Sequence, residues 1–390
     1  MRTGTSFGHA LLAGFASLRL TVALLSLSLV MIFAATLDQV HLGVWGVQRK
    51  YFHAFLVLAK VPGTGFSLPI FPGGYLLGIA LLLNLVTAHA SRFRLSWKKS
   101  GIWLTHLGLI LLLIGEGVSG LMQRDGQVRL NLGQTRRYVE SFRENELAVT
   151  DATDPRYDEV TAIPAALLTG RDFIRHPGLP FAIRTIAYFP NSSLRLRSAE
   201  PFTPPSMATR GVGTEMTVVP EPFTYNPDES NWPTAYVEIT GPDGPLGTWL
   251  VSSALEEPQT FTHEGRLWRL QLRARRDYLP FTLTLGAFAH DIYPGTDIPK
   301  NFASTIRLRG DDGRDDRTVL ISMNHPLRFG GFAFYQGGFA NNDRTSVLQA
   351  VRNPGWRIPY LSCALIAVGL VLQFGLGLFG FLRTRVPSLP

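Results

Sequence analysis

Four long apolar runs constrain the fold of this chain more than any other feature of its sequence. They cover residues 17–37, 70–89, 101–120 and 358–382, and a helix needs about 20 apolar residues to cross a bilayer. The first run is longer than the roughly 7–15 apolar residues of a signal-peptide core, so we expect an uncleaved anchor rather than a cleaved leader. The sequence therefore predicts an integral membrane protein with four transmembrane α-helices.

The positions of the basic residues decide between two explanations for the net charge of +8, which are membrane orientation and nucleic-acid binding. Residues 121–356 contain 25 basic and 27 acidic side chains, whereas the rest of the chain contains 12 basic and 2 acidic ones. The basic surplus therefore flanks the apolar runs, where it indicates membrane orientation. A basic patch for nucleic acid loses its support, and we expect no nucleic-acid partner.

The short loop between the second and third apolar runs indicates the orientation. It is basic and contains no acidic residue, and such loops stay in the cytoplasm. With four spans, this places both termini in the cytoplasm and residues 121–356 outside it. We therefore expect a multi-pass protein of the cytoplasmic (inner) membrane, surrounded by membrane lipid. The basic residues of this loop are Arg92, Arg94, Lys98 and Lys99.

The sequence predicts three parts. Residues 1–120 hold three helices and an outer loop, in which residues 45–60 have the spacing of a short amphipathic helix at the membrane surface. Residues 121–356 alternate polar and apolar residues between turn-forming clusters, which predicts a large extracytoplasmic all-β domain of the sandwich or barrel type. Residues 357–390 hold the fourth helix and a cytoplasmic tail. The expected strands cover residues 127–133, 181–189, 234–240, 266–273, 280–288, 304–310 and 317–323.

No known enzyme motif is found in the sequence, and whether the chain is itself an enzyme stays open. Its single cysteine, Cys363, excludes a disulfide framework and a C-x-x-C redox pair. The absence of a C-x-x-C-H string excludes covalently attached haem. Four aspartates within residues 311–316 lack the spacing of a calcium loop and predict a solvated turn. We therefore predict no catalytic residue.

The most informative residues are polar groups inside the apolar runs, because such groups are costly in a bilayer and usually functional. His106 lies well within the third run, and a neutral imidazole there is a strong axial ligand for haem iron. An interhelical hydrogen bond, for example to Asn84, explains His106 equally well. We expect Glu116 to face water near the outer end of its helix, and His89 to lie among the lipid headgroups.

The segment from Leu279 to Phe339 resembles the carboxy-terminal part of the ResB family, which is also called CcsB and acts in cytochrome c biogenesis. Its most specific part is the string NHPLR-x-x-G-x-x-F-Y-Q at residues 324–336. The layout of three amino-terminal spans, a β domain and a fourth span also agrees with that family. The His-Leu-Gly-Leu string that begins at His106 is similar to the transmembrane histidine segment of the family.

This resemblance implies a role in the system II cytochrome c synthase. There a ResB-type protein works with a ResC (CcsA) partner to move haem outward and attach it to apocytochrome c. The partner carries a tryptophan-rich loop, whereas the seven tryptophans of this chain are scattered, so it resembles the ResB half alone. We expect His106 to supply one axial ligand to the iron of a non-covalent haem b shared with that partner.

One alternative function competes with the haem-handling role, and the other histidines of the chain are not expected to share that role. The alternative function is a non-haem, membrane-anchored β-domain scaffold of a respiratory assembly complex. For the other histidines we expect structural or interface roles rather than ligation, and for His325 in particular a role in fixing a strand-to-membrane junction. These other histidines include His53, His263, His290 and His325.

Overall fold

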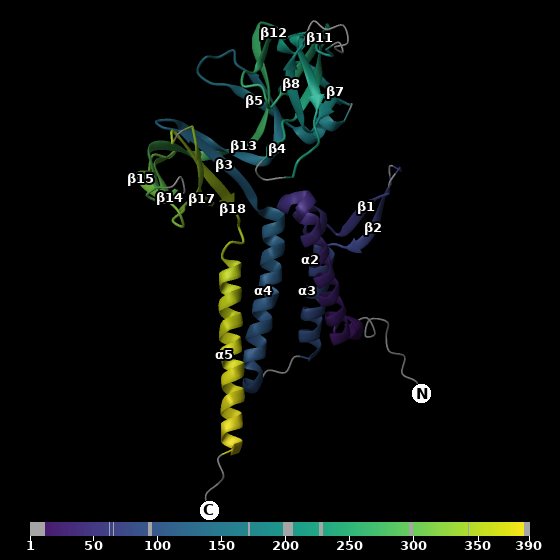
Figure 1. The fold of residues 1–390 in the computed structure, drawn as a ribbon, viewed down its shortest axis with the longest axis vertical. Helices are drawn as coiled ribbons and strands as arrows, with labels where there is room; N and C mark the ends of the chain where they lie inside the picture. Colours follow the sequence, from purple (N-terminus) through teal and green to yellow (C-terminus); the bar gives the residue numbers. More distant parts are fainter. Residues whose placement is uncertain are drawn as a thin grey trace, which may run out of the picture. The chain divides into compact units, whose positions relative to one another are not determined.

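The computed structural model describes residues 12–385 except 62, 65, 93–95, 171, 198–205, 226–228, 296–298 and 342. Arg94 of the basic loop lies outside the described residues. The chain forms two compact units, one helical and one rich in β-strands (Figure 1). The helical unit comprises Met1–Gln123, Tyr225–Pro227 and Asn353–Pro390, and the β unit comprises Arg124–Thr224 and Asp228–Arg352.

In the described part of the chain, four helices are long and apolar enough to cross a membrane, which is the number predicted. The first is longer than its apolar run and includes Asp38. The side chain of Asp38 accepts hydrogen bonds from Lys50 Nζ at 2.5 Å and from the Tyr51 hydroxyl at 2.8 Å, so its charge is paired. The helices are α2 (Leu18–Val47), α3 (Gly74–Arg92), α4 (Ser100–Met122) and α5 (Ile358–Arg385).

The prediction of an amphipathic helix over residues 45–60 is wrong for its second half. The helical backbone ends with η1 (Gln48–Phe52), and the chain then forms β1 (Leu56–Lys60), which pairs antiparallel with β2 (Ser67–Pro72). Residues 70–72 therefore belong to a hairpin, and α3 begins four residues later than expected. Two prolines are tolerated in β2 because a two-stranded sheet consists only of edge strands.

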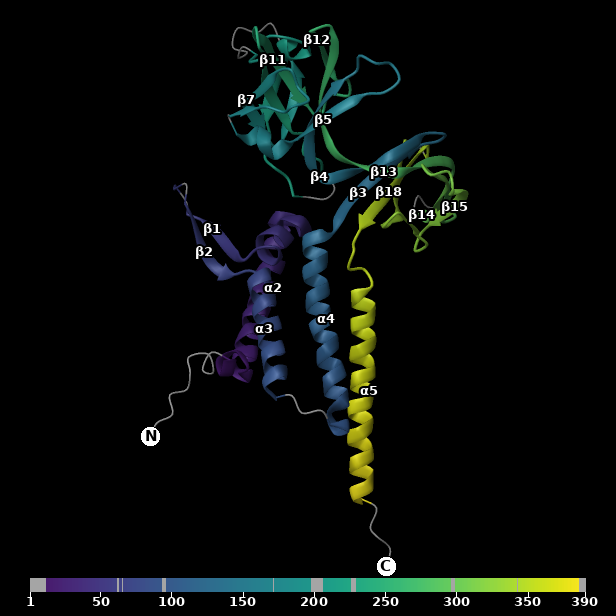
Figure 2. The ribbon, with the colours of Figure 1, turned by 180° about the vertical axis from the view of Figure 1, so that it is seen from behind.

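Helix α4 packs against α5 through glycines spaced seven residues apart, and both views show the two helices side by side (Figures 1 and 2). A Cβ atom added at Gly108 would lie 2.6 Å from Ile366 Cγ1 and 2.8 Å from the carbonyl oxygen of Ser362. Cβ atoms at Gly101 and Gly115 would also lie within 2.6 Å of α5 atoms. Small residues let apolar helices approach closely and gain van der Waals contact, so this stripe holds α4 to α5.

The β unit is built from antiparallel pairs in three sheets. The largest has ten strands, eight of them in the order β15-β14-β13-β4-β3-β18-β17-β16, with β5 and β12 beside β4 and β13. A four-stranded sheet has the order β11-β10-β7-β6, and β8 pairs with β9. The strands are β3 (Arg124–Asn131), β4 (Thr135–Asp151), β5 (Glu159–Pro164), β6 (Phe173–Ile174), β7 (Ala182–Phe189), β8 (Ser192–Leu196), β9 (Met216–Pro220), β10 (Thr234–Gly241), β11 (Gly244–Ser252), β12 (Gln259–His263), β13 (Arg266–Ile292), β14 (Pro299–Gly310), β15 (Asp316–Ser322), β16 (Leu327–Phe329), β17 (Phe332–Ala340) and β18 (Thr345–Arg352).

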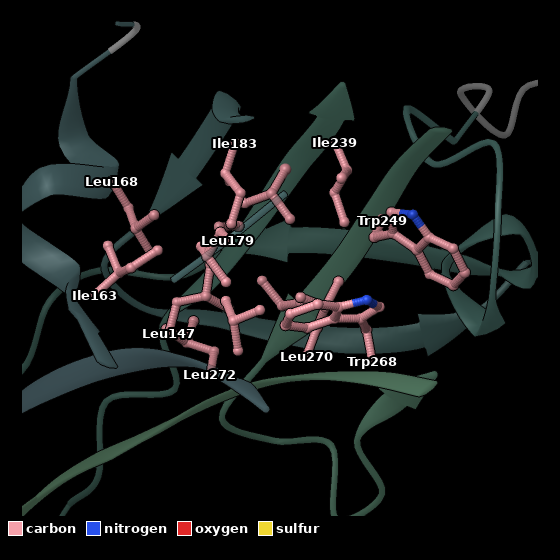
Figure 3. Close-up of a cluster of buried hydrophobic side chains, with 14 of the residues drawn as sticks. Leu147, Ile163, Leu168, Leu179, Ile183, Ile239, Trp249, Trp268, Leu270 and Leu272 are labelled. Carbon is pink, nitrogen blue, oxygen red and sulfur yellow. The ribbon is translucent and has the colours of Figure 1, made fainter. Parts of the chain in front are cut away.

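Two hydrophobic cores share the long strands β4 and β13. The first core lies between the four-stranded sheet and one end of these strands, where buried aliphatic side chains surround Trp249 and Trp268 (Figure 3). The second core is built from the other half of β13 together with β14, β17 and β18, around Phe281 and Phe334. The strands predicted at 266–273 and 280–288 are therefore one continuous strand that contributes to both cores.

Arginine–glutamate pairs join β13 to β4 between the two cores. Arg273 Nε lies 3.0 Å from Glu146 Oε1, and these side chains are only 11% and 5% exposed. Arg275 pairs with Glu144, whose side chain is 60% exposed. The buried pair and the exposed pair therefore offer a matched comparison on the same two strands.

We expect Gly108→Ala to lower the melting temperature of the protein purified in detergent, because the new methyl group forces α4 away from α5. Overpacking of this kind costs about 1–3 kcal/mol, which exceeds the gain in helix propensity of about 1 kcal/mol from replacing glycine. Gly117→Ala is the control, since no heavy atom lies within 4 Å of a Cβ at that position. Equal melting temperatures for the two variants would contradict the proposed role of the glycine stripe.

We expect Glu146→Ala to destabilise the β unit by about 3–5 kcal/mol, because it leaves the guanidinium of Arg273 buried and unpaired. Glu144→Ala removes an exposed partner and is expected to cost no more than about 1 kcal/mol. Urea unfolding followed by tryptophan fluorescence measures both, because Trp268 is buried in the first core. A Glu146→Ala effect as small as that of Glu144→Ala would show that the buried pair contributes little to stability.

Candidate functional site

His106 lies on the face of α4 that is turned toward α3. It is six residues from the start of the helix, which corresponds to about 9 Å along the axis. Its Nδ1 lies 2.8 Å from the carbonyl oxygen of Ile102, one turn earlier in the same helix. A carbonyl oxygen can only accept a hydrogen bond, so Nδ1 carries the proton in the neutral ring and Nε2 keeps its lone pair.

The imidazole of His89 packs directly against that of His106. The two ring centres are 4.6 Å apart with an angle of 50° between the planes, and Trp103 contacts His89 edge to face at 5.0 Å. Like His106, His89 places Nδ1 near the carbonyl oxygen four residues earlier, here Leu85 at 3.1 Å. Two imidazoles and an indole therefore form one aromatic cluster between α3 and α4.

The sequence interpretation assigned His89 to the lipid headgroups and missed this pairing. The positions of the two histidines relative to the helix ends indicate this pairing, because α3 and α4 are joined by the short segment 93–99. His89 lies three residues before the end of α3, and His106 lies six residues after the start of α4. Residues at similar distances from the turn of a helical hairpin lie at similar depths, so the two histidines become neighbours.

Asn84 does not form the hydrogen bond to His106 that the sequence allowed. Its side chain is 2% exposed and joins α3 to the first helix instead. Its Oδ1 accepts a hydrogen bond from the Thr21 hydroxyl at 2.6 Å, and its Nδ2 donates to the carbonyl oxygens of Phe15 and Ser17. His106 therefore satisfies Nδ1 within its own helix, and its Nε2 makes no hydrogen bond to the described residues.

The geometry of the cluster allows His106 alone to ligate a haem iron, and excludes His106 and His89 as ligands on opposite faces of the same haem. Two imidazoles that hold one iron atom between them, each at a nitrogen–metal distance of about 2 Å, separate their ring centres by roughly 6 Å. At 4.6 Å, His89 and His106 leave no room for a porphyrin between their rings. His106 has the donor chemistry of a single axial ligand, with Nε2 as the donor atom, and a second ligand would have to come from elsewhere.

The remaining residues singled out in the sequence lie apart from this cluster. Glu116 is exposed on α4. His53 stacks on Tyr75 with ring centres 5.7 Å apart. His325 is exposed in the tight turn between β15 and β16, with Nδ1 3.1 Å from the carbonyl oxygen of Met323. His325 thus fixes a strand-to-strand turn rather than the expected strand-to-membrane junction.

Comparison with known proteins agrees with the sequence resemblance. Residues 259–347, from β12 into β18, match the model of the ResB-like family. This segment is ResB-like, as the sequence resemblance predicted. The matched segment contains the whole of β13 and the turn with His325, whereas His106 lies outside it.

A curated relative is similar to a larger part of the chain. This relative is Protein NrfI of Wolinella succinogenes, which is 23% identical over 309 residues. The aligned region covers 76% of this chain but only 29% of NrfI. The chain therefore spans less than a third of the length of the curated relative that it matches.

Proposed function

We propose that this chain is the ResB-type component of a cytochrome c synthase of the system II class. In this proposal it works with a ResC (CcsA)-type membrane protein to deliver haem and attach it to apocytochrome c. The observation that carries the proposal is the match of residues 259–347 to the ResB-like family. The four apolar helices and the separate β unit support it, because they agree with the layout that the resemblance implies.

The proposed location is the cytoplasmic membrane, crossed by α2, α3, α4 and α5. Lys98 and Lys99 are exposed in η2 (Trp97–Lys99), just before α4 begins, which supports a cytoplasmic position for this end of the helices. Both termini are then cytoplasmic and the β unit is extracytoplasmic. On that side, the β unit would meet apocytochrome c as it receives haem.

His106 is proposed to hold haem during its passage through the membrane. The haem is cargo, bound without a covalent bond, and its iron takes an axial nitrogen from His106 Nε2. The hydrogen bond from Nδ1 to the Ile102 carbonyl fixes the ring orientation and keeps this donor atom available. The second axial ligand is proposed to come from the ResC-type partner, because His89 is too close to His106 to bind the opposite face of the same haem.

Cysteine labelling tests the orientation. In a Cys363→Ala background, Ser96→Cys and Thr318→Cys introduce single thiols at exposed positions near the basic loop and on β15. We expect a membrane-impermeant maleimide to label Thr318→Cys in intact spheroplasts and to label Ser96→Cys only after lysis. The reverse pattern would overturn the proposed topology.

Replacement of His106 tests the haem role. We expect His106→Ala to assemble with the partner and to lose haem or change its absorption spectrum, because alanine removes the nitrogen donor and is well tolerated in helices. Added imidazole should restore part of the haem binding by entering the vacated space. The measurements are the haem content and spectrum of the purified complex, together with the yield of cytochrome c.

Two histidine variants serve as controls for this experiment. His53→Ala and His325→Ala are expected to leave membrane haem unchanged, since neither side chain contacts the cluster of α3 and α4. Wild-type haem content and spectrum in His106→Ala would show that His106 is not a ligand. A purified wild-type complex that contains no haem would instead favour the non-haem scaffold.

A further inference from the structure

The hairpin of β1 and β2 exposes an apolar surface that the helical unit does not cover. Lys60 is the only lysine, arginine, aspartate or glutamate from residue 51 to residue 91. Both views show the hairpin projecting from α2 and α3 on the side away from α5 (Figures 1 and 2). Six large apolar side chains at residues 55–70 are between 47% and 77% exposed, and they are Phe55, Leu56, Leu58, Phe66, Leu68 and Ile70. Apolar surface of this kind marks an interaction site.

The base of the hairpin is anchored on the first two helices of the unit. Val57 is fully buried and belongs to a hydrophobic cluster that includes Met31 of α2 and Leu77 of α3. Phe71, the partner of Val57 on the other strand, packs against the same cluster. A two-stranded hairpin is only marginally stable by itself in water. Packing of its base therefore holds the hairpin beside α2 and α3.

The uncovered apolar side chains lie on both faces of the hairpin. Residues that pair across two strands share a face, and successive residues alternate between faces. Leu58 pairs with Pro69 on one face, and Ala59 pairs with Leu68 on the other. Phe66 lies at the tip, just before β2 begins. A protein surface that docks on a hairpin covers one of its faces, whereas lipid surrounds both, so this distribution favours lipid.

The backbone of the hairpin determines the depth at which lipid can receive it. Each strand of a two-stranded sheet has an open edge, and unpaired backbone N–H and C=O groups do not enter the hydrocarbon core. At the headgroup level, water reaches these edges while apolar side chains insert at the acyl boundary. Pro69 and Pro72 have no N–H, which leaves β2 with fewer donors to satisfy. The hairpin is therefore suited to the membrane interface.

Lys60 places a positive charge at the end of β1, next to the tip. Its side chain is exposed and makes no hydrogen bond or ion pair with the described residues. A lysine at the edge of an apolar surface keeps its methylene stem in the apolar region and extends its ammonium group to the polar one. No acidic residue lies between Asp38 and Glu116 in the sequence. The charge of this segment therefore complements the phosphate groups of lipids.

We propose that the β1–β2 hairpin binds the lipid surface on the outer side of the membrane, with its apolar side chains at the headgroup level and Lys60 at the lipid phosphates. The inference rests on the proposed location of the helices in the cytoplasmic membrane. The hairpin thus takes the place at the membrane surface that the sequence assigned to an amphipathic helix. Because its base packs on α3, it anchors the helix that faces His106.

Spin-label accessibility in proteoliposomes tests the inference without haem or a partner protein. In a Cys363→Ala background, the full-length chain receives one nitroxide at Leu58→Cys or at Leu68→Cys, on opposite faces of the hairpin. Oxygen concentrates in lipid and a nickel chelate concentrates in water, so power saturation with the two reagents reports the surroundings of each label. We expect both labels to show a ratio of oxygen to nickel accessibility several-fold higher than a label at Thr318→Cys, which is exposed on β15.

A label at Val371→Cys, which is 73% exposed on α5, is the lipid control that separates the possible outcomes. Hairpin labels that match Thr318→Cys while Val371→Cys lies in lipid would overturn the inference and leave the proposed location standing. Hairpin labels that are shielded from both reagents would also overturn it, because they would show contact with protein. A ratio at Val371→Cys as low as that at Thr318→Cys would contradict the proposed location and the inference with it.

Replacement of Lys60 tests the contact with lipid phosphates. We expect Lys60→Glu to lower the oxygen-to-nickel ratio at Leu68→Cys, and to do so more in vesicles that contain phosphatidylglycerol than in phosphatidylcholine alone, because anionic lipid repels the new carboxylate. Lys60→Gln is the matched neutral variant and should change the ratio less. An equal ratio in Lys60→Glu and the parent protein, in both kinds of vesicle, would contradict the placement of Lys60 at the phosphates.

Discussion

The close contact between α4 and α5 is the interaction on which the rest of the structure depends. Three glycines at intervals of seven residues let the backbones approach until no Cβ atom fits between them. The chain continues from α4 into β3 and from β18 into α5, and β3 pairs with β18 over eight residues. The same two segments are therefore neighbours in both units, first as a helix pair and then as a strand pair.

This contact also determines which way His106 points. Gly108 faces α5, and His106 lies two residues earlier, which is about 200° away around the helix. With one face of α4 occupied by α5, the opposite face is left for α3, where His106 meets His89. A single helix thus combines tight packing on one side with a nitrogen donor on the other.

The sequence predicted elements well where the local pattern was sufficient, and it failed where a distant partner decided the structure. The four helices follow from apolar length alone. The continuity of β13 was missed because Arg275 and Arg276 interrupt its alternation, and only their glutamate partners on β4, more than 120 residues earlier, explain them. Likewise, β1 has helical spacing but forms a strand because β2 is there to pair with it.

Prediction of the candidate site also failed where a residue from another part of the chain decides the geometry. His106 stood out because a histidine within an apolar run is unusual in itself. His89 did not, because its significance depends on His106, a neighbour that folding brings to it. The similar distances of the two histidines from the helix ends indicate this pairing only once the helix boundaries are known.

The central claim of this account is that His106 ligates haem iron, and exchanging the ligand atom tests it most directly. His106→Cys places a thiolate donor where the imidazole was, and thiolate-ligated haem has a spectrum distinct from that of imidazole-ligated haem. The account predicts that haem in the purified complex with the ResC-type partner takes on the thiolate signature in the ferrous carbon monoxide spectrum. An unchanged imidazole spectrum at full haem occupancy would contradict it.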